Sequence, residues 1–458
     1  MLILKETPQM NIYQAMLPPE LVRLNDELTK VSALLDNENF LTPFVAKFAT
    51  TTGRPTVPVQ TYLRIMYLKS RHQLSYVALV EQIRDSIMWR IFCRIPFDKP
   101  VPHSTTLIKL TKKYGPEIIE NLNLALVNEA REKKLVLGRK LRCDTTVVES
   151  NIHYPTDASL LSDCVRVITR TVKKIKEQGV TAGAEFHNRT RSVRKRIYSI
   201  AKVLKRRTNE ARNDVREITK SILSTTREVV DQAQHVLTEV KQRISNQTDV
   251  VSEAVDRAVK SLESTVEITK KIINQTVSVE QGNTHIKNRV VSVFDTDARP
   301  IVKGKLKAPV EFGTKLLIQD CEQKIITRYQ VFEGNPSDDT LLLPAVDAHI
   351  AMFGRAPISV ATDRGFASPT NEAALRKREV EKISLPRRGW LTYERRDYQS
   401  QFWFKYLQRW RAGEEAQISL LKRRYGLGRS LSRGINGTKT WVGLGILAYN
   451  LRQIARLT

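Results

Sequence analysis

The sequence predicts an α/β protein whose sheet domain is interrupted by a long helical insertion and preceded by an all-helical region. Three observations support this prediction. The first part holds short helical segments with capping residues, and β-branched runs occur before residue 150 and again after residue 286. Between them glycine and proline nearly vanish. We therefore expect an N-terminal helical domain at 1–135, a split domain at 136–157 and 286–458, and a helical insertion at 158–285.

The charge of the chain favours a polyanionic partner. Its 458 residues carry 75 Lys and Arg against 48 Asp and Glu, a net charge of +27. A solvated basic protein is the alternative. The four cysteines form no CxxC pair, which argues against zinc and disulfides and fits a reducing cytoplasm. The sequence shows neither a leader nor an apolar run of about 18 residues, so we expect no membrane partner.

The N-terminal region predicts several short helices in succession. Pro58, Ser75 and Ser86 precede the first three, and Ser104 precedes a fourth. The expected helices are Val59–Ser70, Tyr76–Arg84, Ile87–Arg94 and Thr105–Tyr114, and the last carries Lys109, Lys112 and Lys113. Short helices that end in a basic one indicate a helix-turn-helix-like DNA reader, with an ordinary helical domain as the alternative.

The first strand carries a charged residue in an unusual setting. A helix at Glu117–Lys134 is expected to lead into a strand at Lys140–Val148, which is rich in β-branched residues. Asp144 lies inside this strand. A carboxylate within an apolar strand is costly without a partner or a metal ion, so Asp144 is a candidate site residue.

The insertion shows apolar residues at seven-residue steps, namely Val230, Leu237, Ile244, Val251 and Ala258. This spacing predicts long amphipathic helices packed as a bundle or coiled-coil arm. We expect a break at Gly179–Gly183 and a reversal at Ser245–Asp249, where Thr248 or Asp249 could cap a helix. A DNA clamp, a dimerisation arm and a passive insertion remain open.

After residue 282 strands and helices alternate. The order of strand, insertion, paired strands, helix, strand, helix, strand and helices is that of an interrupted RNase H-like domain. Asp338 or Asp339 is expected to start the first of these helices, and Ser368 with Pro369 the second. The strands are Val310–Gln319, Ile325–Phe332, Ile358–Ala361 and Lys382–Leu385, and the helices are Thr340–Phe353, Thr370–Arg378, Phe402–Arg424 and Trp441–Arg456.

Two further carboxylates could join Asp144. Asp363 follows a short strand, and Glu415 lies on a helix where Arg411 and Lys422 fall within roughly 40° of it around the axis. Phosphodiester chemistry uses two divalent cations about 3.5–4 Å apart, held by hard oxygen ligands such as carboxylates. Alone, Asp363 would be a turn or cap residue, and Glu415 a surface residue paired with Arg411.

Two other acidic residues are weaker candidates for this site. Glu414 is the rival ligand on the same helix, but it points about 100° away from the face of Arg411 and Lys422. Glu149 is a possible auxiliary carboxylate, for which we favour a structural role.

Four segments carry a family resemblance: RCDTTVVESNIHYPTDASLLSD, EGNPSDD, ATDRGFASPTNEAAL and RAGEEAQISLLKRRYGLGRS with the final WVGLGILAYNLRQIAR. They resemble bacterial insertion-sequence transposases of the DDE class, nearest to the ISNCY-type group, from about residue 40 to the end. The wider group shows Tyr-x2-Arg-x3-Glu-x6-Lys around its third carboxylate. Arg411, Glu415 and Lys422 match that pattern, and Gln408 stands where the tyrosine would be.

The resemblance implies that Asp144, Asp363 and Glu415 bind two Mg²⁺ ions, for which Mn²⁺ could substitute. Arg411, Lys422 and Arg364 would hold DNA phosphates. The partners would be double-stranded DNA, at element ends and target, and further copies of the chain in a dimer or larger synaptic complex. The location would be the bacterial cytoplasm at the nucleoid. The expected function is a transposase; the alternatives are a catalytically silent DNA-binding regulator and an RNase H-like nuclease without strand transfer.

Overall fold

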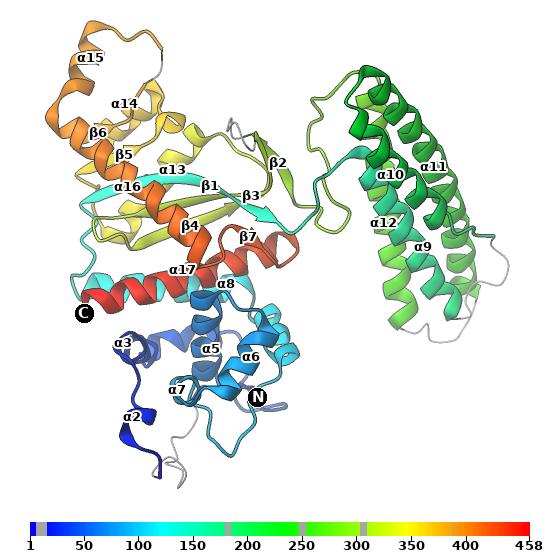
Figure 1. Ribbon diagram of the computed structural model, residues 1–458. Helices are drawn as coiled ribbons and strands as arrows, with labels where there is room; N and C mark the ends of the chain where they lie inside the picture. The colour runs from blue at the N-terminus through cyan, green and yellow to red at the C-terminus, as the bar shows by residue number, and fades with distance from the viewer. Residues whose placement is uncertain (6–15, 179–184, 247–252, 303–308, 388) are drawn as a thin grey trace. The chain divides into compact units, whose positions relative to one another are not determined.

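The computed structural model describes residues 1–5, 16–178, 185–246, 253–302, 309–387 and 389–458. These residues form two compact units. The first combines residues 1–151 with 313–458, and the second comprises residues 152–312. Figure 1 shows the first unit as a sheet with helices on both sides, and the second as a set of long helices. The N-terminal helices therefore share a unit with the sheet, although the whole second unit separates its two parts along the chain.

The N-terminal part is helical, as the sequence predicts. Ser75 and Ser86 cap their helices through side-chain oxygens that accept from Ala78 and Trp89. One cap differs from the prediction, because His103 and not Ser104 caps the helix Ser104–Glu132. The elements are α2 (Pro19–Val22), α3 (Asp26–Leu35), η1 (Glu38–Phe40), α4 (Thr42–Val45), α5 (Val59–His72), α6 (Tyr76–Asp85), α7 (Ile87–Phe92) and α8 (Ser104–Glu132).

Helix α8 joins two helices that the sequence predicts separately. Gly115 has φ of 73° and Pro116 follows it, so the chain kinks there before the helix resumes. A left-handed residue suits glycine, which has no Cβ to clash. The two predicted segments therefore continue as one kinked element.

The sheet has the mixed topology expected of an RNase H-like domain. β3 runs antiparallel between β1 and β4, while β5 and β6 continue the sheet parallel to β1 on its other side. The short β7 pairs with the end of β1. The strands are β1 (Lys140–Ser150), β3 (Val310–Asp320), β4 (Ile326–Phe332), β5 (Ser359–Thr362), β6 (Lys382–Ser384) and β7 (Arg429–Ser430).

Each face of the sheet is covered by helices. Val148 and Ile318 point into a core shared with α8 and the last helix, whereas Cys143 and Leu317 point into a second core under the helix that follows β4. The alternation follows from the two-residue period of a strand. The covering elements are α13 (Asp338–Phe353), η3 (Arg364–Phe366), α14 (Pro369–Lys377), α15 (Tyr393–Ser400), α16 (Phe402–Arg424) and α17 (Gly434–Leu457).

The second unit is built mainly of helices, in agreement with its low glycine and proline content. Val230 and Leu237 are buried in its own apolar core, as their spacing predicts. Buried threonines accommodate their hydroxyls by donating to the carbonyl four residues earlier, as Thr226 does to Ile222. The elements are α9 (Asp157–Glu177), α10 (Thr190–Val203), η2 (Leu204–Arg206), α11 (Asn209–Asn246), α12 (Glu253–Glu280) and β2 (Arg299–Val302).

Some expectations for this unit fall outside the described residues. The break at Gly179–Gly183, the caps Thr248 and Asp249, and the heptad residue Val251 belong to this group. Among the helices that the structure does describe, none has the length and apolarity needed to cross a membrane.

Glu27 joins three helices of the first unit. Its carboxylate accepts from Arg71 of α5 at 2.8 Å, from Arg452 of α17 at 2.7 Å and from the Tyr67 hydroxyl at 2.9 Å. Burial alone would raise the pKa of Glu27, but these hydrogen bonds outweigh it and lower the pKa to about 2. The ionised form therefore ties α3 to α5 and α17.

This pairing predicts a pH-dependent contribution to stability. Because the folded pKa lies below the unfolded value, the contribution is present above about pH 4.5 and is lost as pH falls through about 2. Glu27→Gln should lower the free energy of unfolding by about 1–2 kcal/mol at pH 7, after allowance for solvent screening. Urea unfolding should show this difference shrinking below pH 4. Glu117→Gln, at an exposed pair with Lys47, should change little, and an equal loss in both variants would contradict the assignment.

Candidate active site

Two of the candidate carboxylates lie on neighbouring parallel strands. Cys143 of β1 pairs with Thr362 of β5, so Asp144 and Asp363 are each the next residue along. The Asp144 side chain is 13% exposed and its Oδ1 accepts from the Thr145 amide at 2.7 Å. Asp363 ends β5 and caps η3 by accepting from the Gly365 amide at 2.8 Å. Strand register therefore places both carboxylates at one level of the sheet.

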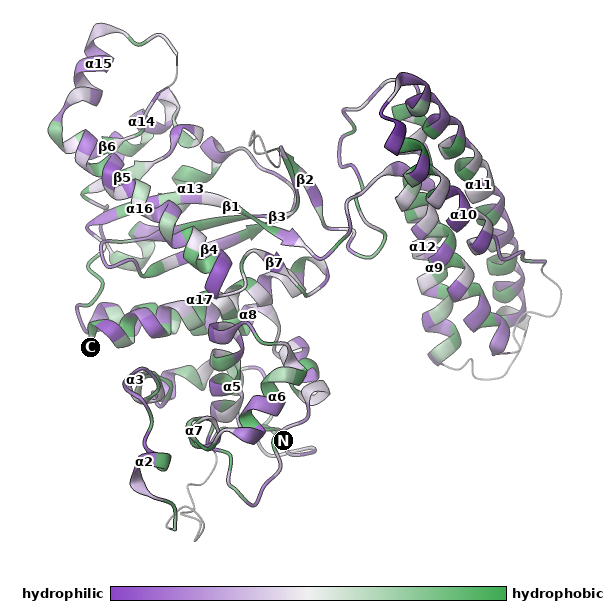
Figure 2. Cartoon of the chain, in the orientation of Figure 1, coloured by the Kyte–Doolittle hydropathy of each residue, from purple (hydrophilic) through white to green (hydrophobic). Residues whose placement is uncertain are grey.

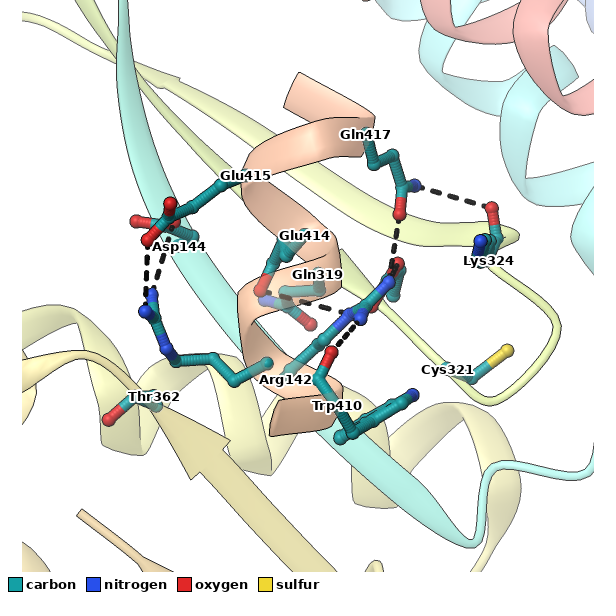
Figure 3. Close-up of polar contacts among 12 residues, drawn as sticks. Arg142, Asp144, Gln319, Cys321, Lys324, Thr362, Trp410, Glu414, Glu415 and Gln417 are labelled. Carbon is teal, nitrogen blue, oxygen red and sulfur yellow. Dashed lines mark hydrogen bonds and ion pairs between the residues drawn. The ribbon is translucent and has the colours of Figure 1, made fainter. Parts of the chain in front are cut away.

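Helix α16 crosses the sheet beside these strands and carries the third candidate. Gln408 donates to the carbonyls of Thr362 and Ser384, where β5 and β6 end. Two turns later Glu415 lies beside Asp144 in Figure 3. The sequence motif places a tyrosine at the position of Gln408 in the wider group; here the amide fastens α16 to the strands instead.

Arg411 lies between two of the carboxylates. Its Nη2 is 2.9 Å from Glu415 Oε1 and its Nη1 is 3.9 Å from Asp144 Oδ2. The Arg411 side chain is only 15% exposed, whereas that of Glu415 is 66% exposed. The i, i+4 pair expected from the helical spacing therefore forms, and it also reaches the strand carboxylate.

Glu414 points in a different direction from Glu415 on α16 (Figure 3), as the 100° rotation between successive helical residues requires. It is fully buried, and among the described residues neither carboxylate oxygen has a hydrogen-bond partner. Burial, with Asp320 and Asp144 nearby, raises its pKa well above the usual range. Glu414 is thus enclosed in the protein, with Arg142 Nε 3.9 Å from its Oε2, whereas Glu415 faces solvent.

A buried arginine fastens α16 to the sheet. Arg142 of β1 makes a bidentate pair with Asp320 of β3, with N–O distances of 2.5 and 2.6 Å, and both side chains are at most 1% exposed. The same guanidinium donates to the Trp410 carbonyl at 2.5 Å and to Gln417 Oε1 at 3.0 Å, both on α16. Arg411 and Glu415 lie between Trp410 and Gln417 in the helix. The hydrogen bonds of Arg142 therefore fix the part of α16 that carries the candidate site residues.

Sequence reasoning did not select one acidic neighbour of the site. Asp338, at the start of α13, accepts from Thr145 Oγ1 at 2.9 Å and pairs with Lys315 Nζ at 2.6 Å. A Cβ built on Gly365 would meet Asp338 Oδ2 at 2.9 Å and Asp363 Oδ1 at 3.1 Å, so the two carboxylates flank one glycine. The EGNPSDD segment marked this residue only as a helix start. The tertiary fold brings it beside Thr145 and Asp363.

The other predicted basic residues lie apart from the carboxylates, except Arg364, which is exposed next to Asp363. Lys422 is seven residues beyond Glu415, about 10 Å further along α16. It lines a cavity of about 210 Å³ with Lys69, Arg429 and Trp441 among others. On α8, the side chains of Lys109, Lys112 and Lys113 are exposed. Glu149 pairs with Arg429 at 2.7 Å, consistent with a structural role.

The donor atoms at this edge suit a hard divalent cation, which prefers carboxylate oxygen. Within the described residues, however, no group of three His, Cys, Asp or Glu side chains is arranged to hold a metal ion. The Arg411 guanidinium takes the place between Asp144 and Glu415. The carboxylate oxygens therefore have the chemistry that the expected metal ion prefers. Binding of the ion between Asp144 and Glu415 would require the Arg411 guanidinium to move away from them.

Comparison with known protein families assigns both ends of the chain. Residues 19–113 match a transposase domain, and residues 292–451 match the transposase DDE domain. The chain thus carries the domains of a DDE transposase. A DDE domain is an RNase H-like domain for metal-dependent phosphoryl transfer on DNA. The second match contains Asp363 and Glu415 and begins after Asp144. It does not distinguish the ISNCY-type group from other insertion-sequence transposases.

This transposase also resembles a curated protein whose function is not described. It is 30% identical over 128 residues to "Uncharacterized protein ORF8 in nfe locus" of Rhizobium meliloti, an alignment that covers 27% of this chain and 61% of that protein. No solved structure matches the chain at a significant level. The similarity to this curated protein therefore assigns no activity to the chain.

The Arg142 network yields a prediction about stability. Arg142→Met should lower the free energy of unfolding by about 3–5 kcal/mol, because it leaves Asp320 buried without its partner. Chemical denaturation would measure the loss. Arg429→Met, which removes an exposed pair with Glu149, should cost less than about 1 kcal/mol. Equal costs for the two variants would show that the buried pair does not anchor α16.

Proposed function

We propose that this transposase cuts DNA at the ends of its own element and joins the freed 3′-OH to target DNA. The observation that carries the proposal is the arrangement of Asp144, Asp363 and Glu415. They come from two paired strands and the helix packed across them, with an arginine among them. Strand transfer would form a bond between the 3′ oxygen and a target phosphorus while the target's own P–O3′ bond breaks.

In this proposal Asp144, Asp363 and Glu415 hold two Mg²⁺ ions, or Mn²⁺ in their place. When bound, such ions activate the attacking oxygen and stabilise the leaving one. Arg411 would leave the carboxylates and bind a phosphate next to the cut, a task that its planar, always charged group suits. Arg364, beside Asp363, would contact the same strand, and Lys422 would contact DNA further along α16.

The N-terminal helices would read the terminal repeats of the element. Short capped helices lead into α8, where Lys109, Lys112 and Lys113 are exposed. Such cations contact phosphates, and a neighbouring helix would contact base edges in the helix-turn-helix manner. Two ends must be joined in one event, so we propose a dimer or larger synaptic complex. The site would act at the nucleoid, where its substrate is found.

The carboxylates provide the main test. With Mg²⁺ and labelled DNA from both flanks of the gene, the parent protein should nick the repeat ends and join free 3′-OH ends to target DNA. Asp144→Asn, Asp363→Asn and Glu415→Gln should each abolish both products while leaving end binding largely intact. Glu414→Gln is the matched control and should cut, because the buried carboxyl faces away from the site.

The outcomes separate the proposed activity from its alternatives. Binding without nicks in the parent protein would favour a silent DNA-binding regulator, and nicks without joined products would favour a nuclease. Full cutting by Glu415→Gln would remove Glu415 from the site.

Arg411 gives a prediction that needs no catalysis. If the guanidinium and the metal ions use the same carboxylate oxygens, Arg411→Ala should tighten Mn²⁺ binding by the free protein severalfold, as titration calorimetry would measure. The same variant should cut DNA at least tenfold more slowly, since the phosphate loses its bidentate donor. Arg411→Lys should restore only part of the rate. Unchanged Mn²⁺ affinity in Arg411→Ala would contradict competition for these oxygens.

A further inference from the structure

Helix α10 of the second unit has an unusual charge pattern. It contains five basic residues and no acidic residue. Arg191, Arg194, Lys195 and Lys202 fall within roughly 100° of arc at 100° per residue, opposite the buried Val193. All four are exposed. We call these four residues the basic ridge; Figure 2 shows hydrophilic residues, coloured purple, along α10.

An exposed aromatic residue lies within the ridge. Tyr198 is 57% exposed, and Arg194 donates to its hydroxyl at 3.0 Å while stacking on its ring. The basic character continues past the helix into η2 and the start of α11. The further exposed cations are Lys205, Arg206, Arg207, Arg212 and Arg216, of which Arg206 pairs with Asp214.

The ridge works against the stability of its own helix. Like charges three and four residues apart repel each other, and cations in the first turn oppose the helix dipole. Several cations elsewhere in the unit are offset by acidic neighbours. On α12, for example, Arg257, Lys260 and Lys271 each pair with an acid four residues earlier. Among the described residues no carboxylate forms an ion pair with any member of the basic ridge.

The apolar side of α10 shows which kind of polyanion fits. Val193 is buried, and Ile197 and Ile200 pack against the core of the unit. A helix that lies on a membrane needs a free apolar face to insert between lipids. Since α10 has already used its apolar face inside the protein, it presents only cations and Tyr198 outward. A charged backbone is therefore a better match than a lipid surface.

We propose that the basic ridge binds the sugar–phosphate backbone of duplex DNA, which gives the helical insertion a function as a second DNA-binding surface. The proposal rests on the proposed function for its substrate class. From Arg191 to Lys202 the ridge spans about 16 Å, the axial length of about five base pairs. Ion pairs with phosphates add affinity without sequence preference, and each one releases counterions.

Salt dependence provides the test. The full chain would carry Arg191→Ala, Lys195→Ala and Lys202→Ala together, and its affinity for a duplex of unrelated sequence would be measured from low to moderate salt. The slope of log affinity against log salt should fall by about 2–3, at about 0.9 for each phosphate that the variant no longer neutralises. The control triple Lys260→Ala, Lys270→Ala and Lys271→Ala removes the same charge from exposed positions on α12, and its slope should stay near that of the parent. Circular dichroism would verify that both variants fold.

Each outcome decides the matter. Equal slope changes in the two triples would mean that only net charge acts, which overturns the ridge. The proposal would also be overturned if the ridge variant lost binding to anionic vesicles or duplex RNA while its DNA binding stayed unchanged. The measurement is repeated on an Asp144→Asn background, where no cutting is expected. If the salt slope changed only in the ridge variant and the parent protein did not cut DNA, the ridge would still be a DNA-binding surface. Only the proposed cutting activity would then be contradicted.

Discussion

The buried pair of Arg142 and Asp320 is the interaction on which the site depends. It joins β1 to β3, and the remaining donors of the same guanidinium reach α16 on either side of Arg411 and Glu415. Charges this deeply buried are costly unless every donor finds an acceptor. Here the acceptors come from one strand, β3, and one helix, α16, so the position of the helix determines whether the arginine is satisfied. That position presents Glu415 beside Asp144 and turns Glu414 into the interior.

The same geometry explains how one helix can hold two adjacent glutamates in different states. Glu414 is surrounded by protein, and this burial raises its pKa well above the usual range. Glu415, one residue further along, is exposed and pairs with Arg411. The difference arises from the 100° rotation between successive residues.

The two units differ in how they manage their basic residues. In the first unit many cations are tied into pairs that join elements, as Arg71 and Arg452 are with Glu27. In the second unit α12 follows the same rule, but the basic ridge of α10 faces outward without acidic neighbours among the described residues. The presence or absence of an acidic partner thus distinguishes structural arginines and lysines from those that are available to a polyanion. Composition alone does not show this difference.

The sequence by itself determined the order and type of most of the longer elements, because helix caps, β-branched runs and apolar spacing are local signals. Helix Phe402–Arg424 has the predicted bounds, while α17 begins seven residues before the predicted Trp441. The spacing of Arg411 and Glu415 also predicted their pairing. Only the tertiary structure decided that Asp338 contacts Thr145, that Lys422 lines a separate cavity, and that Arg142 anchors α16. These contacts join residues up to 275 positions apart, and they follow from strand pairing and buried charge, which no local pattern encodes.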